Sequence, residues 1–120
     1  MLNDKNRNYG KTKELTVAEL KDGFASLDYV DIAILFGSRA AGSAHDKSDY
    51  DFALLMKKDA DEIWGMESKA WSDIHDIFSL DDCDYDVINL ARTSQAMKDS
   101  IKTGYIVLKG DKDDISELLG

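Results

Sequence analysis

The chain has 120 residues, of which 43% are hydrophobic, and its formal net charge is -9 at pH 7. This length suits one domain with a modest core and is too short for two ordinary domains. The acidic balance argues against a general nucleic-acid binder, which needs a basic face to displace counterions from phosphates. No apolar run approaches the ~20 residues of a membrane span, and the polar N-terminus lacks the apolar centre of a secretory signal. We therefore expect a cytoplasmic protein that contacts neither membranes nor nucleic acids.

The charge is distributed unevenly along the chain. Residues 1–15 carry four basic and two acidic side chains, whereas the rest of the chain is strongly acidic. The first residues are polar and show no periodicity, so we predict a flexible basic tail over 1–14 and a single folded domain over 15–120. Cys83 is the only cysteine, which excludes an internal disulfide framework.

The first half of the chain predicts a helix, a buried strand and a short helical turn. Thr16 and Glu19 form a capping-box pattern at the start of the first helix. A continuous apolar run then indicates a buried strand, and Gly42 is suited to end the turn that follows. The expected elements are a helix over 16–27, a strand over 32–36, a helical turn over 38–41 and a loop over 43–48.

The second half alternates strands with helices and has no internal repeat. Polar and apolar residues alternate from Asp49 onward, which is typical of a strand, and Thr93 or Ser94 is placed to cap a later helix. The expected elements are a strand over 50–56, a helix over about 60–80, a strand over 85–90, a helix to about 102, a short segment over 105–108 as a fourth strand on an edge, and a last helical turn or two over 113–119. This order predicts an α/β (α+β) domain.

Gly37 and Ser38 stand where the first strand turns into a helical turn. A glycine has no Cβ, so the backbone here can approach a ligand closely. The backbone N–H groups that follow favour a phosphate, and Ser38 adds a hydroxyl donor. A Gly-Ser pair alone is a weak signal, but its place predicts a phosphate-binding turn.

Asp49 and Asp51 are two residues apart, so both carboxylates should project from the same face of a strand. Like charges at this separation raise each other's pKa unless a cation lies between them. Magnesium prefers carboxylate oxygens together with substrate phosphates, and two such ions can orient an attacking oxygen and stabilise a leaving pyrophosphate. The alternative is a strand with one solvated face.

Asp86 lies within an apolar segment that we expect to be a largely buried strand. A carboxylate there is costly unless it meets a metal ion or another cation. Asp86 would therefore complete the ligand set and act as general base on an acceptor hydroxyl. Asp84 shares its face by the two-residue period, but it lies nearer the start of the strand and should be exposed.

These parts together resemble a known enzyme superfamily. Gly37-Ser38, ten further residues, Asp49-x-Asp51 and a later strand aspartate are similar to the DNA polymerase β nucleotidyltransferase superfamily, and the form of the motif is closest to its minimal nucleotidyltransferase (MNT) branch. The resemblance spans about residues 32–109. It implies a small mixed sheet of three to four strands flanked by helices, with the nucleotidyltransferase domain over 15–120. It also implies that Ser38 contacts the triphosphate, while Asp49, Asp51 and Asp86 bind two Mg²⁺ ions, or Mn²⁺.

Larger superfamily members carry extra domains that hold the base, the sugar and the acceptor, and this chain is little more than a catalytic core. The MNT branch often occurs beside a helical HEPN protein in toxin–antitoxin pairs, where the antitoxin transfers AMP from ATP to a tyrosine of the toxin. That resemblance implies ATP and a HEPN-type toxin as partners. Two alternatives stay open: transfer of a nucleotide to a small-molecule hydroxyl, and an antitoxin that acts by binding alone.

Several polar residues near the motif have no role that the sequence decides. Arg39 follows the phosphate-binding turn and is suited either to contact a phosphate or to cover the helix surface and pair with an acid. His45 and His75 are expected to be surface residues of a loop and a helix. Nothing in the sequence decides whether Lys102 or Lys109 faces the triphosphate.

Overall fold

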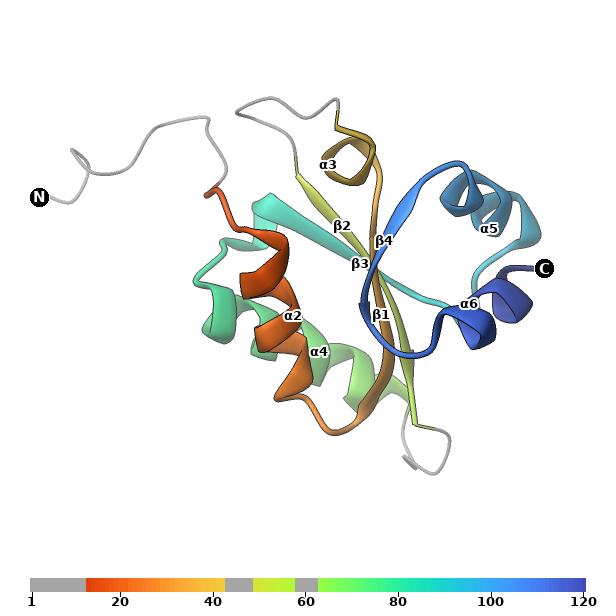
Figure 1. Cartoon of the computed structure of the whole chain (residues 1–120). Helices are drawn as coiled ribbons and strands as arrows, with labels where there is room; N and C mark the ends of the chain where they lie inside the picture. Colours follow the sequence, from red (N-terminus) through yellow and green to blue (C-terminus); the bar gives the residue numbers. More distant parts are fainter. Residues whose placement is uncertain (1–12, 43–48, 58–62) are drawn as a thin grey trace, which may run out of the picture.

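The computed structural model describes residues 13–42, 49–57 and 63–120, and of residues 63–66 only the backbone. A four-stranded sheet crosses the middle of the domain, with helices on both sides (Figure 1). The expected loop over 43–48, with His45, and the expected start of the long helix at 60–62 lie outside the described residues. In chain order the elements are α2 (Val17–Ala25), β1 (Val30–Phe36), α3 (Ser38–Ala41), β2 (Tyr50–Met56), α4 (Ile63–Phe78), the 3-10 turn η1 (Asp82–Asp84), β3 (Tyr85–Asn89), α5 (Gln95–Lys102), β4 (Tyr105–Lys109) and α6 (Lys112–Leu119).

The sheet is mixed, as expected, and its strand order is β3-β2-β1-β4. The strand β1 runs antiparallel to both β2 and β4, whereas β2 and β3 are parallel. The predicted fourth strand, β4, does lie on an edge. The other edge strand is β3, which we had expected to be largely buried.

The helices form two layers that cover opposite faces of the sheet. Helices α2 and α4 lie on one face, and α5 and α6 lie on the other (Figure 1). Both faces of the sheet are therefore apolar, because successive side chains of a strand point to opposite sides. In β1, Ala33 and Leu35 pack toward α2 and α4, while Ile32 and Ile34 pack toward α5 and α6.

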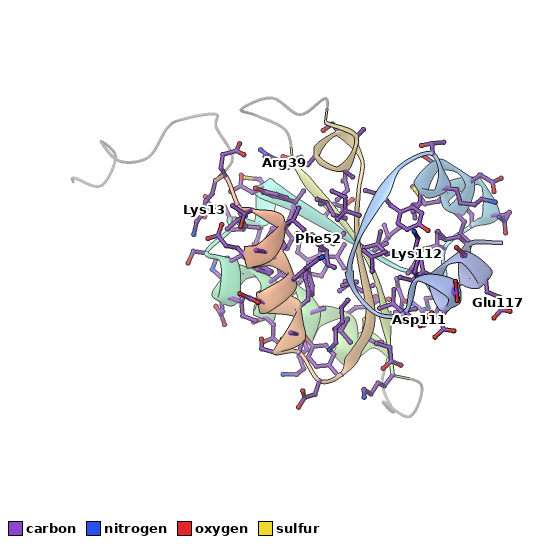
Figure 2. All side chains as sticks on the ribbon, in the orientation of Figure 1. Lys13, Arg39, Phe52, Asp111, Lys112 and Glu117 are labelled. Carbon is purple, nitrogen blue, oxygen red and sulfur yellow. The ribbon has the colours of Figure 1, made fainter. Side chains whose placement is uncertain are left out.

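An aromatic cluster forms the centre of the α2–α4 side. The ring of Phe52 in β2 lies 5.2 Å from Phe24 and 5.9 Å from Tyr50, measured between ring centroids. It also lies 6.4 Å from Phe78, at the end of α4. Figure 2 shows Phe52 on this side of the sheet. The cluster joins both helices to the central strand pair through fully or nearly fully buried rings.

Capping interactions place the helix ends where the sequence predicts them. The Thr16 side chain accepts a hydrogen bond from the N–H of Glu19, and the Glu19 carboxylate accepts one from the N–H of Thr16, so the capping box of α2 is formed. Ser94 is the N-cap of α5 and accepts a hydrogen bond from the N–H of Met97. Gly42 ends α3 in the left-handed conformation, with φ of 80°.

Residues 13–15, at the end of the predicted tail, contact the domain. The Tyr50 hydroxyl donates to the carbonyl of Lys13 and accepts from the N–H of Leu15. The Lys13 ammonium donates to the carbonyl of Phe78. No helix in the described ranges has both the length and the apolar character to span a membrane.

We predict that Phe52→Ala lowers the free energy of unfolding by about 3–5 kcal/mol, because it removes the ring at the centre of the aromatic cluster and leaves a cavity. Val17→Ala is the control, since Val17 is exposed on α2 and its loss should change stability by no more than about 0.5 kcal/mol. Urea unfolding of both variants measures the difference. A Phe52→Ala loss as small as that of the control would contradict this description of the core.

Candidate active site

One row of side chains crosses all four strands at one end of the sheet. Phe36, the last residue of β1, lies opposite Asp51 in β2 and Tyr105 in β4. Asp51 in turn lies opposite Asp86 in β3. Directly paired residues share a face of a sheet, so the row Tyr105–Phe36–Asp51–Asp86 lies on the face that α5 and α6 cover. Two aromatic side chains thus stand beside two carboxylates.

Asp51 is the electrostatic centre of this row. Its side chain is half-buried, and burial raises the pKa of its carboxyl above the ordinary value of 3.8. The charge of Asp86 and then that of Asp49 raise this pKa further. Asp49 directly precedes β2 and is exposed. The three predicted metal ligands therefore interact with one another through Asp51.

Our expectation for the surroundings of Asp86 was wrong in one respect. We expected a largely buried strand, but β3 is an edge strand and the Asp86 side chain is exposed. The apolar residues around Asp86 suggested a buried strand. They are apolar because helices lie on both faces of β3: Tyr85 and Val87 face one helical layer, and Ile88 faces the other. The cost of burial is therefore no argument that Asp86 binds a metal ion. Its pairing with Asp51 is what brings its carboxylate into the row. Asp84 lies outside the strand in η1, where its carboxylate accepts from the N–H of Asp81.

Gly37 directly follows Phe36 of the row, and two features require a glycine at this position. Its φ is 79°, in the left-handed region that side chains rarely adopt. A Cβ at this position would also collide with a carboxylate oxygen of Asp51. The backbone of the predicted phosphate-binding turn therefore lies directly against the Asp51 carboxylate. Ser38 is the first residue of α3 and is half-buried.

The donor chemistry of the row fits Mg²⁺. Asp51 and Asp86 provide hard carboxylate oxygens from adjacent strands, and Asp49 adds a third. Within the described parts of the chain, no three carboxylate, imidazole or thiolate groups are already arranged closely enough to enclose an ion. A metal ion would thus have to draw these carboxylates together, which is favourable because it relieves their repulsion.

The sequence left two roles open for Arg39, and the structure shows the second, in which Arg39 pairs with an acid. Its Nη1 donates to both carboxylate oxygens of Glu14 at 3.1 Å, and its guanidinium lies 4.3 Å from the centre of the Tyr50 ring. The Arg39 side chain is only 7% exposed. Tyr50 belongs to the α2–α4 side of the sheet, so Arg39 lies across the sheet from the Asp51 carboxylate. Phosphate binding by Arg39 remains a prediction.

The other polar residues that we considered contact parts of the fold away from the row. The Lys109 ammonium donates to the carbonyl of Leu27, and the Lys102 ammonium donates to the carbonyl of Gly120. His75 is an exposed residue of α4, as expected, and its Nδ1 lies 2.6 Å from the carbonyl oxygen of Leu80. These contacts do not direct either lysine toward the carboxylates.

Sequence reasoning missed Phe36 and Tyr105 as members of the row. Phe36 reads as the end of an apolar strand, and Tyr105 as the start of another. Only the pairing of β1 with β4 brings them together beside Asp51. The one signal available was that Phe36 directly precedes Gly37.

We predict that Asp51→Asn stabilises the metal-free protein at pH 7. A carboxyl with a raised pKa in the folded chain contributes stability that is full at low pH and is lost as the pH rises through that pKa. The ionised Asp51 is therefore unfavourable at neutral pH, and an amide removes the charge. The melting temperature should rise in EDTA, and the difference from the wild type should shrink as the pH approaches about 4.

Asp22→Asn is the control for this measurement, because Asp22 is an exposed acid on α2. It should leave the melting temperature almost unchanged at each pH. A lower melting temperature for Asp51→Asn at pH 7 would show that the Asp51 charge is stabilised in the fold, contrary to the repulsion described above.

Comparison with known proteins identifies the family to which the fold and these residues belong. Residues 18–113 match the family model described as "Polymerase beta, Nucleotidyltransferase". No curated protein matches the chain in sequence. Similar solved structures include a toxin–antitoxin complex with AMP-PNP, at a TM-score of 0.60 and 23% identity over 88% of this chain and 82% of that one.

Two further structures share the fold. One is tri-AMPylated Shewanella oneidensis HEPN toxin in complex with MNT antitoxin, with a TM-score of 0.54 and 20% identity over 87% of this chain and 81% of the other. The second is the toxin–antitoxin complex MntA–HepT, with a TM-score of 0.52 and 20% identity over 86% and 74% of the two chains. The family model covers most of this chain, and the chain therefore belongs to the polymerase beta nucleotidyltransferase family, with a fold shared by proteins of MNT toxin–antitoxin complexes.

Proposed function

We propose that this protein is a Mg²⁺-dependent nucleotidyltransferase that transfers AMP from ATP to a tyrosine of a HEPN-type toxin. The observation that carries the proposal is the position of Asp51, which pairs with Asp86 across adjacent strands, follows Asp49 by two residues and lies against the backbone of Gly37. Three repelling carboxylates beside a phosphate-binding turn are suited to bind a metal–triphosphate complex, because divalent cations balance both sets of negative charge.

In this proposal, distinct roles fall to Asp51 and Asp86 of the row and to Gly37, Ser38 and Asp49 beside it. The backbone at Gly37 and the hydroxyl of Ser38 hold the triphosphate, and Asp49 and Asp51 hold the two metal ions. Asp86 holds one of them and takes the proton of the acceptor hydroxyl. The acceptor oxygen forms a bond to the α-phosphorus, the bond from that phosphorus to its bridging oxygen breaks, and pyrophosphate leaves. Divalent ions held by these carboxylates would stabilise the charge of the leaving pyrophosphate.

A protein acceptor suits the shape of this chain. The carboxylate that would activate the acceptor, Asp86, is exposed on an edge strand, and no described strand pairs with the outer side of that strand. Similar folds come from a complex with AMP-PNP and from a complex that contains an AMPylated HEPN toxin. The adenine nucleotide and the toxin acceptor in our proposal are supported by those neighbours together with the carboxylates, whereas the tyrosine follows from the resemblance to the MNT branch.

The test is to incubate the protein with Mg²⁺, each nucleoside triphosphate and the product of the adjacent gene, and to weigh that product by intact mass spectrometry. We expect one or more added AMP groups with ATP, and none without Mg²⁺. Asp49→Asn should reduce the rate at least about a hundredfold, as expected when a catalytic metal ligand is lost, while Asp22→Asn keeps the full rate.

Two results would contradict the proposal in different ways. No mass gain with any nucleotide would exclude modification of this partner. If a doubly substituted Asp49→Asn, Asp51→Asn protein still neutralised the partner in cells, the protein would act by binding alone.

A further inference from the structure

The strand β3 has a free edge directly beside the exposed carboxylate of Asp86. In the described part of the chain its only strand neighbour is β2. The N–H of Leu90 donates to the carbonyl of Leu54 at 2.8 Å, so the even-numbered amides face β2. Because amides alternate along a strand, those of Val87 and Asn89 point away from the sheet. This edge can therefore pair with a further strand.

Asp86 itself covers part of this edge. Its Oδ1 accepts a hydrogen bond from the N–H of Val87 at 3.0 Å. The carboxylate that we place on a metal ion therefore also caps the outward amide of Val87. A carboxylate that turns toward a metal ion releases this amide, which then becomes available to the carbonyl of another chain.

Two cavities lie beside the edge of β3. A cavity of about 390 Å³ contacts both Val87, which faces α4, and Ile88, which faces α5, so it extends around the edge from one face of the sheet to the other. A second cavity of about 610 Å³ continues along α4. Both are lined by Trp71 and Glu67. Side chains of an added strand would alternate between the two faces, and these cavities provide space for them.

The charge at the start of β3 favours a basic partner. Asp82 in η1 and Asp86 in β3 are both exposed. Asp82 and Glu67 also line the second cavity. Lysine or arginine side chains on a docked segment would lie in this negative field and be attracted to it.

We propose that the free edge of β3 binds an extended, basic segment of the acceptor protein as a fifth strand of the sheet. The proposal rests on the proposed function, because the docked segment is the one that carries the modified tyrosine. The amides of Val87 and Asn89 donate hydrogen bonds to the segment, while the Asn89 carbonyl keeps its bonds from Arg92 and Thr93. The side chains of the segment occupy the cavities that Trp71 lines. In this binding mode, main-chain hydrogen bonds provide affinity and the fit of side chains in pockets provides specificity. It also brings a hydroxyl group of the segment close to Asp86.

Hydrogen exchange of the full-length chain tests the docking without any substitution. The amides of Val87 and Asn89 should exchange about tenfold more slowly when Mg²⁺, AMP-PNP and the product of the adjacent gene are present, which corresponds to one added hydrogen bond each. Amides of β4, the opposite edge, should not change. Protection of β4 or of the helices without protection of β3 would overturn the proposal, and so would the lack of any complex.

Asn89→Pro removes an outward amide without removing a bond to β2, and proline is tolerated at such edge positions. Asn89→Ala is the matched control, because both variants lose the side-chain bonds of Asn89 to Glu67 and to the N–H of Ala91. We expect the proline variant to raise the KM for the acceptor protein about tenfold and the alanine variant to change it little. Affinity for AMP-PNP should stay the same in both.

The outcomes separate this proposal from the proposed function. If the wild type transfers AMP and the two Asn89 variants have the same KM, the docking edge is wrong and the function stands. If the wild type transfers nothing but β3 becomes protected, the edge binds the partner and the proposed transfer is wrong.

Discussion

The repulsion among three carboxylates at one end of the sheet is the constraint on which the site depends. This repulsion acts most strongly on Asp51, because burial and the charges of Asp86 and Asp49 all disfavour its ionised form. The fold holds Asp51 and Asp86 together by parallel pairing of β2 with β3, while the aromatic cluster around Phe52 anchors β2 from the opposite face. Core packing thus maintains an electrostatic arrangement that is unfavourable in the absence of a cation.

Local patterns predicted most of the elements but not how they pair. The capping box at Thr16 and the left-handed Gly42 depend on neighbours within a few residues, so the sequence was enough to place them. The pairing of Phe36 with Tyr105 joins residues 69 positions apart, and no local pattern encodes it. The expected burial of β3 failed because an apolar run does not distinguish a central strand from an edge strand with a helix on each face.

The edge position of β3 has consequences for both the chemistry and the partner. In a central strand, Asp86 would be covered by a neighbouring strand and could not meet an acceptor protein. At the edge it is exposed, while its partner across the ladder, Asp51, stays half-buried beside Gly37. The row therefore has an inner end suited to a triphosphate and an outer end suited to an acceptor. An open edge is consistent with an acceptor supplied by another protein.

Calorimetric titration of AMP-PNP in the presence and absence of Mg²⁺ measures whether these carboxylates bind a metal–triphosphate complex. We expect binding of one nucleotide per chain that requires Mg²⁺ and is lost in Asp51→Asn, although that variant remains folded. Equal binding with and without Mg²⁺, or undiminished binding by Asp51→Asn, would contradict the claim that the carboxylate row holds a metal–triphosphate complex.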